Sequence, residues 1–314
     1  MFERIFQEII NFDTVIIHRH TKPDGDAIGS QVGLKHILKD AFPGKNIFAV
    51  GDPAGRYAFI KDSTPDNISD DVFKKALSII LDCGGEVSDK RYKLAARTAR
   101  IDHHVFNGAY TDAEVIDSSF ESCCGLIVSF AQEQRLYISP VAAEALFTGM
   151  VTDSGRFRYD STTPRTFRQA AFLLERGVDL NEIYRNLYAD DFYYKRLRAQ
   201  YTMKIRFTKN NVAYIYSTKE ELAASGYDVF AISRGMVSVM SDIRGVDIWV
   251  NFTETDDGVL CELRSSGESI VHIAVKYGGG GHDKACGATV SSREEAMKML
   301  DDLDNFAGEN PDGK

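Results

Sequence analysis

Short apolar runs recur along the N-terminal part of the chain, and segments with helical spacing separate them. The runs lie at residues 14–18, 45–50, 78–82 and 98–102. Residues 26–42, between the first two runs, place apolar residues such as Ile28 and Val32 at helical spacing. Buried strands separated by helices predict an α/β fold with a doubly wound, mostly parallel sheet. Ligands of such sheets bind beyond the carboxyl ends of the strands.

A helical region and a second α/β region follow. Residues 122–207 resemble helices, and one of these places Gly149 and Asp153 on an apolar stripe. Strand-like runs return at 211–217, 247–254 and 259–265, and helical segments are expected near 227–240, 269–276 and 292–306. The pattern predicts an N-terminal α/β domain over 1–190, a helical connector over 191–209 and a smaller C-terminal α/β domain over 210–314.

Composition narrows the class of protein. The 314 residues are 44% hydrophobic and 26% charged, as in ordinary soluble globular proteins. No apolar run approaches the ~20 residues of a membrane span, and the N-terminal segment lacks the basic and apolar stretches of a signal peptide. The five cysteines show no metal-binding spacing and are expected to be buried thiols. We therefore expect a cytoplasmic protein without a membrane partner.

Net charge argues against a long polyanionic partner. The chain has 37 Lys and Arg against 46 Asp and Glu, so its formal net charge is −9. Long duplexes and long single strands usually meet a basic groove, which this composition does not indicate. Small anionic substrates are compatible with the chain if basic side chains cluster locally.

Acidic and histidine residues collect where the predicted apolar elements end. The set consists of His20, Asp24, Asp26, Asp82, His103, His104 and Asp153. Two divalent ions ~3.5–4 Å apart need several carboxylates, a bridging group and a few imidazoles. The set therefore predicts a two-metal hydrolytic site. Carboxylates outnumber imidazoles and no thiolate pattern accompanies them, which favours two Mn²⁺ ions, with Mg²⁺ or Co²⁺ as substitutes.

Each of these residues also has an ordinary structural explanation when it is taken alone. Asp26 could be only a helix N-cap, and Asp24-Gly25 only a turn. The combination at several strand ends favours the metal site. His103 and His104 are adjacent, and on an extended segment their side chains would point in opposite directions. One imidazole could then bind a metal while the other faces the substrate.

A glycine run in the C-terminal region suggests a second functional feature. Gly278-Gly279-Gly280-Gly281 precedes His282, and Arg264 lies earlier in the chain. Glycines let backbone N–H groups approach an anion closely, and a guanidinium binds phosphate with a fork of donors. The alternative is a flexible turn with Arg264 as a solvated charge. Opposite a metal site, a phosphate cradle is the preferred interpretation.

The motifs together resemble the DHH phosphoesterase superfamily. The resemblance rests on HRHTKPDGDAIGS, the strand end at Asp82, IDHH and TDSGRF. The run KYGGGGHDKACGA, after ELRSSG, resembles the associated DHHA1 substrate-binding domain. The match covers nearly the whole chain and is nearest to the stand-alone nanoRNase and pAp phosphatase branch.

The resemblance implies roles for particular residues. His20, Asp24 and Asp82 would hold the first Mn²⁺. Asp26, Asp82, His103 and Asp153 would hold the second, with Asp82 bridging. His104, Asp82 and His103 would be the catalytic residues, with His104 facing the scissile phosphate. The expected substrate contacts are Arg264, Ser265, Gly279, Gly280, Gly281, His282 and Arg156.

The implied function is hydrolysis of very short oligoribonucleotides from the 5′ end and of 3′,5′-bisphosphorylated adenosine, pAp. The same ligands would serve a cyclic di-AMP or pApA phosphodiesterase, which stays open as an alternative. A RecJ-like exonuclease would need a basic groove, and a non-catalytic nucleotide sensor would lack a metal ligand. Expected partners are short oligonucleotides, pAp or dinucleotides, without long duplex DNA, and the chain could form a homodimer.

Overall fold

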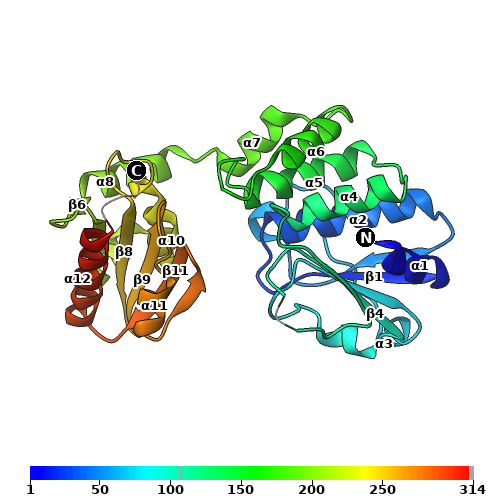
Figure 1. The fold of residues 1–314 in the computed structure, drawn as a ribbon, viewed down its shortest axis with the longest axis horizontal. Coiled ribbons are helices and arrows are strands. Elements are labelled where there is room, and N and C mark those ends of the chain that lie inside the picture. The colour runs from blue at the N-terminus through cyan, green and yellow to red at the C-terminus, as the bar shows by residue number, and fades with distance from the viewer. Residues whose placement is uncertain (107, 311–314) are drawn as a thin grey trace. The chain divides into compact units, whose positions relative to one another are not determined.

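The protein is described by a computed structural model that covers residues 1–106 and 108–310. It forms two compact units, Met1–Ala189 (unit 1) and Asp190–Lys314 (unit 2), each with its own sheet and hydrophobic core (Figure 1). The predicted connector, 191–209, contributes a helix and a short strand to unit 2. The division into three parts stays a prediction, and the last four residues of its third part, 311–314, lie outside the described residues.

Unit 1 contains the first apolar runs as strands. Its strands are β1 (Thr14–His18), β2 (Asn46–Ala49), β3 (Leu77–Leu81), β4 (Arg97–Asp102) and β5 (Ala113–Ile116). Its α-helices are α1 (Glu3–Asn11), α2 (Gly25–Ala41), α3 (Asp70–Phe73), α4 (Cys123–Glu133), α5 (Pro140–Asp153), α6 (Pro164–Leu174) and α7 (Leu180–Tyr188). Two 3₁₀ turns are η1 (Gly55–Tyr57) and η2 (Lys90–Leu94).

The strands of unit 1 form a parallel sheet in the order β2-β1-β3-β4-β5. This order places a topological switch point between β1 and β3, where ligands of doubly wound sheets bind. Alternate residues of β1 face opposite sides of the sheet. Val15 and Ile17 share a core with α2 and α4, whereas Ile16 packs in a cluster with Phe73 of α3. The predicted α/β fold with a parallel sheet is confirmed.

A glycine stripe on α2 allows that helix to approach α5 closely. The stripe consists of Gly25, Gly29 and Gly33. A Cβ atom at Gly29 would lie 2.4 Å from the carbonyl oxygen of Ala145, and one at Gly25 would lie 2.5 Å from Oγ1 of Thr152. A glycine is therefore needed at position 25 because there is no space for a side chain beside α5, and Gly25 lies within α2, not in a separate Asp24-Gly25 turn. The contact brings the first turn of α2 to the last turn of α5.

Unit 2 is a second α/β arrangement. Its strands are β6 (Arg206–Phe207), β7 (Ala213–Ser217), β8 (Ile248–Thr255), β9 (Gly258–Ser265), β10 (Gly280–His282) and β11 (Ala285–Val290). Its helices are α8 (Phe192–Met203), α9 (Lys219–Ser225), α10 (Val229–Val237), α11 (Val271–Lys276) and α12 (Arg293–Glu309), with the 3₁₀ turn η3 (Ser238–Met240). The strand order is β10-β11-β9-β8-β7-β6, and among the described strands of this sheet only the β7–β8 pair is parallel.

Alternating residues of the second sheet divide between two cores. Val250 and Leu263 pack with α11 and α12, whereas Ile215 and Trp249 pack with α8 and α10. Residues of β9 on the α10 side, among them Arg264, are only partly buried. The α10 face of the sheet is therefore open over β9, its neighbour β11 and the edge strand β10, which pairs with β11.

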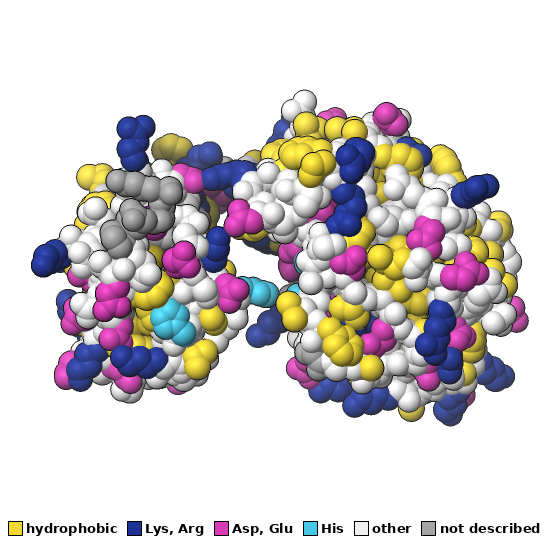
Figure 2. Space-filling model, viewed as in Figure 1, with side chains coloured by type: hydrophobic (Ala, Val, Ile, Leu, Met, Phe, Trp, Pro, Cys, Tyr) yellow, Lys and Arg dark blue, Asp and Glu magenta, His cyan; other side chains and the backbone are white. Residues whose placement is uncertain are grey.

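Several short elements escaped the sequence pattern. The predicted runs correspond to β1 to β4 and β7 to β9, whereas β5, β6, β10, β11 and α9 were not predicted. No helix within residues 1–106 and 108–310 is long and apolar enough to cross a membrane. On the face drawn in Figure 2, basic and acidic side chains are interspersed on both units.

Candidate functional site

The carboxyl ends of three neighbouring strands carry the predicted polar side chains. His20 follows β1, Asp82 follows β3 and His103 follows β4. Asp82 has φ 50°, a left-handed conformation that Asp tolerates better than most residues, and it turns the chain as β3 ends. Because the strands are parallel, the three side chains reach the same edge of the sheet, beside the β1–β3 switch point.

The first group of ligand atoms comes from His20, Asp24 and Asp82. Nε2 of His20 lies 3.8 Å from Oδ1 of Asp24 and 3.6 Å from Oδ2 of Asp82. Nδ1 of the same ring lies 2.7 Å from the carbonyl oxygen of Thr21, which fixes the ring with Nε2 toward the acids. Asp24 is the N-cap of α2, since its Oδ1 accepts the backbone N–H groups of Asp26 and Ala27. The cap that the sequence allowed at Asp26 is therefore at Asp24.

The second group surrounds His103. Its Nε2 atom lies 3.7 Å from Oδ2 of Asp26 and 3.4 Å from Oδ2 of Asp153. Nε2 also lies 3.4 Å from Oδ1 of Asp82, the oxygen that does not face His20. Asp82 thus turns one carboxylate oxygen toward each group.

Asp26 is fixed in this group by the N-terminus of α4. Its two carboxylate oxygens accept the backbone N–H groups of Cys123 at 2.7 Å and Cys124 at 2.9 Å. The first N–H groups of a helix have no partner within the helix and carry a partial positive charge. They hold the buried carboxylate in place, and its remaining lone pairs face His103.

Burial and mutual charge set the protonation of the cluster. Burial opposes a charge on His20 and His103, but the close carboxylates outweigh it and raise the pKa of each imidazole to about 11. Burial, aided by repulsion from Asp82, raises the pKa of Asp153 to about 7 and the pKa of Asp26 well above its usual range. Protons on the two imidazoles balance part of the negative charge of the cluster.

The donor set fits divalent cations. Each of three sets has ligand atoms within 4.8 Å of one another: His20, Asp24 and Asp82; Asp26, His103 and Asp153; and Asp82, His103 and His104. Oδ1 of Asp82 is buried and has no hydrogen-bond partner among the described residues. A buried carboxylate oxygen in that state is costly unless a cation satisfies it. The chain therefore has groups able to bind metal ions where the sequence predicts them.

His104 is held by Asp102. Nδ1 of His104 lies 2.7 Å from Oδ1 of Asp102, which also accepts the His104 backbone N–H at 3.1 Å. This hydrogen bond, against the effect of burial, raises the pKa of the His104 imidazole. The ring centroids of His103 and His104 are 4.7 Å apart. The expectation that the two side chains point in opposite directions is therefore wrong. Strand alternation no longer applies there because β4 ends at Asp102.

A buried arginine behind Asp102 was missed by sequence reasoning. Nε of Arg100 lies 3.8 Å from Oδ2 of Asp102, and both side chains are fully buried. The Arg100 guanidinium also lies over the Tyr110 ring, 4.7 Å from its centroid. Two charged residues two positions apart in an apolar strand lie on the same side of it, which is the signal that could have found the pair.

Arg156 lies just beyond α5, on a left-handed turn. Gly155, Arg156 and Phe157 have φ values of 57°, 64° and 63°. The Arg156 guanidinium lies over the Tyr188 ring of α7, 3.9 Å from its centroid. The arginine is thus oriented by an aromatic ring, and its role in binding substrate stays a prediction.

Unit 2 contains a groove of about 750 Å³ on the α10 side of its sheet. From the predicted substrate contacts, the groove lining includes Arg264, Gly279, Gly280, Gly281 and His282. Residues 280–282 form the edge strand β10, paired with β11, so the glycine run is not a loose turn. Gly278 and Gly281 have φ values of 75° and 134°, which side chains with a Cβ atom rarely adopt.

Ser265, the remaining predicted contact, does not line this groove. Its hydroxyl accepts the backbone N–H of Gly267 at 3.0 Å, and the residue is buried. The groove is lined instead by residues of α10 that the sequence did not single out, Phe230, Ser233 and Arg234. Phe230 and Arg234 are exposed and Ser233 is buried, and a helix of nine residues is too short for its periodicity to mark the face that lines a groove, which is why they were missed.

Comparison with known proteins confirms the resemblance drawn from the motifs. Residues 14–150 match the DHH family, N-terminal domain, and residues 213–309 match the DHHA1 domain. The bifunctional oligoribonuclease and PAP phosphatase NrnA of Bacillus subtilis (strain 168) is 33% identical over 314 residues, which cover 98% of this chain and 99% of that protein. The protein of the same name in Mycoplasma genitalium is 32% identical over 303 residues, 94% of each chain.

A solved structure agrees with these matches. The crystal structure of an exopolyphosphatase-related protein from Bacteroides fragilis is similar with a TM-score of 0.87 and 26% sequence identity. The similarity covers 97% of this chain and 95% of that one. Because both domain matches occur in order and relatives align over nearly their full length, this chain belongs to the DHH family and carries a DHHA1 domain.

Proposed function

We propose that this protein is a metal-dependent phosphoesterase that hydrolyses very short oligoribonucleotides, from the 5′ end, and pAp. The observation that carries the proposal is the sharing of Asp82, whose two carboxylate oxygens face two separate groups of ligand atoms. Two adjacent groups of this kind are what two-metal hydrolysis of a phosphoester requires. The relatives in B. subtilis and M. genitalium are named as both oligoribonuclease and PAP phosphatase, which supports the choice of substrates.

Two Mn²⁺ ions are the cofactors in this proposal. One would be held by His20, Asp24 and Asp82, and the other by Asp82, Asp26, His103 and Asp153. Such ions, when bound, lower the pKa of a water molecule and neutralise charge on phosphoryl oxygens. The imidazole in each group favours Mn²⁺ over Mg²⁺, and the absence of cysteine from both groups argues against structural zinc.

His104 would bind the scissile phosphate. Asp102 accepts a hydrogen bond from Nδ1 of His104 and so fixes the ring. The raised pKa of His104 favours the doubly protonated imidazole, whose Nε2–H can donate to a phosphoryl oxygen. Arg100 lies close to the other oxygen of Asp102 and keeps that carboxylate in position. Arg156 would add a second positive charge to the phosphate site.

Unit 2 would bind the remainder of the substrate. Arg264, the backbone N–H groups of residues 279–281 and His282 line one groove and offer donors to a phosphate. The net charge of −9 supports substrates of a few nucleotides over long strands. The five free, buried cysteines support a cytoplasmic location, and a homodimer stays a prediction.

Chromatographic product analysis tests the proposal. The protein would be incubated with Mn²⁺ and, in parallel, with pApA, a five-nucleotide RNA, pAp and cyclic di-AMP. Turnover of the linear substrates and pAp, with little turnover of the cyclic one, is the expected result. Dominant cleavage of cyclic di-AMP would move the protein to second-messenger hydrolysis. Lack of turnover of all four, with metal bound, would reject the proposal.

A further inference from the structure

One wall of the unit 2 groove is a face of α10 with an exposed aromatic ring. Phe230, Ser233 and Arg234 lie three and four positions apart on this helix, so they share one face, and all three line the groove. Phe230 is 57% exposed, although large apolar side chains are usually buried. The Arg234 guanidinium lies over the Phe230 ring, 5.5 Å from its centroid. The wall therefore presents two flat groups together.

The floor of the groove includes two glycines that lie side by side on neighbouring strands. In the sheet register, Gly280 of β10 pairs with Gly287 of β11, and Gly287 pairs with Glu262 of β9. A Cβ atom at Gly279 would lie 2.1 Å from the carbonyl oxygen of Gly287. The chain therefore runs close to β11 at this point, and the glycines add no side chains that would keep a planar ligand from this part of the floor.

A single carboxylate fixes the cations of the groove. Glu262 lies between two arginines, with Oε1 at 3.0 Å from Nε of Arg234 and Oε2 at 3.2 Å from Nη2 of Arg264. Nη1 of Arg264 also donates to the carbonyl oxygen of Leu263 at 2.8 Å. Two guanidiniums against one carboxylate leave a net positive charge. The groove thus offers a positive charge for an anion at Arg264 and two flat groups, the Phe230 ring and the Arg234 guanidinium, for a planar ligand at α10.

We propose that Phe230 and Arg234, the α10 platform, stack against the nucleobase of a nucleotide whose phosphate binds at Arg264 and the glycine run. Aromatic rings and guanidinium planes stack on any base, because every base has a π-face. The platform therefore binds purines and pyrimidines alike. The proposal deepens the proposed function and rests on it for the class of ligand. It names the residues that distinguish a nucleotide from a bare phosphate ester.

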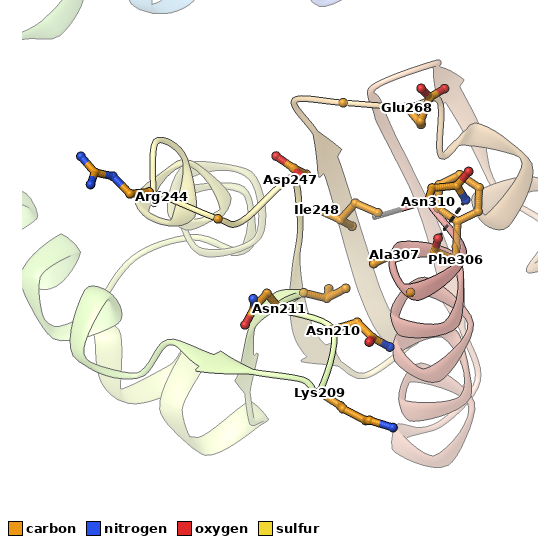
Figure 3. Close-up of a pocket in the computed structure, with 14 residues that line it drawn as sticks. Lys209, Asn210, Asn211, Arg244, Asp247, Ile248, Glu268, Phe306, Ala307 and Asn310 are labelled. Atoms are coloured by element: carbon orange, nitrogen blue, oxygen red, sulfur yellow. Dashed lines mark hydrogen bonds between the residues drawn. The ribbon is translucent and has the colours of Figure 1, made fainter. Parts of the chain in front are cut away.

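A second cavity of unit 2 provides the control. It has a volume of about 600 Å³ and is lined by residues that include Lys209, Asn210, Arg244 and Phe306. Figure 3 shows that Arg244 and Lys209 extend from opposite sides of this cavity and do not converge. Its aromatic lining residue, Phe306, is partly buried against the core, and its ring lies against the His272 ring, with 5.0 Å between the ring centroids. Arg244→Ala thus removes a positive charge from the same unit without touching the platform.

Equilibrium binding tests the platform without turnover. The full-length chain with Mn²⁺ would be titrated with 5′-AMP and with ribose 5-phosphate, which lacks the base. The unsubstituted protein should bind AMP about tenfold more tightly, as expected for one stacked base. Phe230→Ala should remove most of this preference, whereas Phe230→Trp and Arg244→Ala should keep it. Equal affinity for the two probes, no binding of either, or an unchanged preference in Phe230→Ala would overturn the proposal.

Kinetics separate this proposal from the proposed function. Hydrolysis of pAp by the unsubstituted protein, with a KM that Phe230→Ala raises about tenfold at unchanged kcat, supports both. Hydrolysis with the same KM in Phe230→Ala overturns the platform and leaves the proposed function standing. A base preference in binding that Phe230→Ala removes, without hydrolysis of pAp, pApA, the five-nucleotide RNA or cyclic di-AMP, supports the platform and rejects the proposed function. Because Phe230 is largely exposed, its replacement should leave the melting temperature unchanged.

Discussion

The cluster of acids and histidines in unit 1, our proposed metal centre, and the groove of unit 2 both contain charged side chains, but these are buried to different degrees. Asp26 and Asp82 are 1% and 2% exposed, whereas the side chains of Arg234 and Arg264 are 67% and 26% exposed. The acids are held by helix N–H groups and imidazoles. The arginines are held by one carboxylate, Glu262, at the edge of the solvent.

This difference assigns different energetic roles to the two regions. Charges removed from water must be balanced permanently, by a proton or by a cation, because an unbalanced buried charge costs several kcal/mol. Charges at a groove surface keep contact with water until a ligand displaces it. Substitutions in the centre should therefore abolish chemistry and metal binding, and substitutions in the groove should weaken substrate binding alone.

The strongest test of the contrast is Asp82→Ala. Loss of the shared carboxylate removes a ligand from both groups, so kcat should fall by more than about 100-fold, the upper range for loss of an outer-shell partner. Metal content, measured by mass spectrometry, should fall with it. Asp71→Ala removes an exposed carboxylate from the same unit and should change neither quantity. Full metal occupancy in Asp82→Ala would show that Asp82 is not a ligand.

Arg264→Ala tests the groove. Hydrogen bonds to charged groups contribute ~1.5–3 kcal/mol, so KM for pAp should rise about 10- to 100-fold. The metal content and kcat should stay at their original values, because the substitution lies in the other unit. Arg244→Ala is again the matched control. Unchanged KM in Arg264→Ala would remove the groove from the proposed function.

The protonation of the centre predicts how metal binding depends on pH. His20 and His103 have a pKa near 11 in the metal-free protein, above the ordinary 6.5. Their contribution to stability is therefore present below pH 6.5 and is lost as the pH rises toward 11. Metal ions must displace these protons, so the affinity for Mn²⁺ should rise about tenfold per pH unit for each proton released.

Thermal melts with and without Mn²⁺ at pH 6, 7.5 and 9 would measure this effect. The increase in melting temperature on adding Mn²⁺ should grow with pH, since ligand binding stabilises the folded state by an amount that rises with the logarithm of the affinity. An increase that stays constant across this range would mean that no protons leave on binding. That result would contradict the protonated imidazoles inferred from the geometry.

The sequence indicated which acids and histidines of unit 1 lie together better than it indicated the lining of the groove, for a physical reason. Strands such as β3 are apolar on both faces, so their ends are visible in the pattern, and acids at those ends meet because the strands are parallel. The short strand β5 includes Glu114 and gave no such signal. Other contacts join residues far apart in the sequence, such as the Arg156 guanidinium and the Tyr188 ring. They depend on which helices become neighbours, so the local sequence pattern does not reveal them. The groove wall formed by α10 also depends on which elements become neighbours, and the sequence pattern did not reveal it.

The smallest expected effect concerns the packing that supports the centre. A Cβ atom at Gly29 would lie 2.4 Å from the carbonyl oxygen of Ala145, so Gly29→Ala should push α2 away from α5. Overpacking costs ~1–3 kcal/mol, and the better helix propensity of alanine returns ~1 kcal/mol. Denaturant unfolding should thus show a loss of up to about 2 kcal/mol. Gly44→Ala, which meets nothing within 4 Å, should be neutral. Gly29→Ala should lower kcat, because a shift of α2 moves Asp26 on the same helix. KM should stay unchanged, because the groove belongs to the other unit. A change in KM alone would contradict the assignment of catalysis to unit 1 and of substrate binding to unit 2.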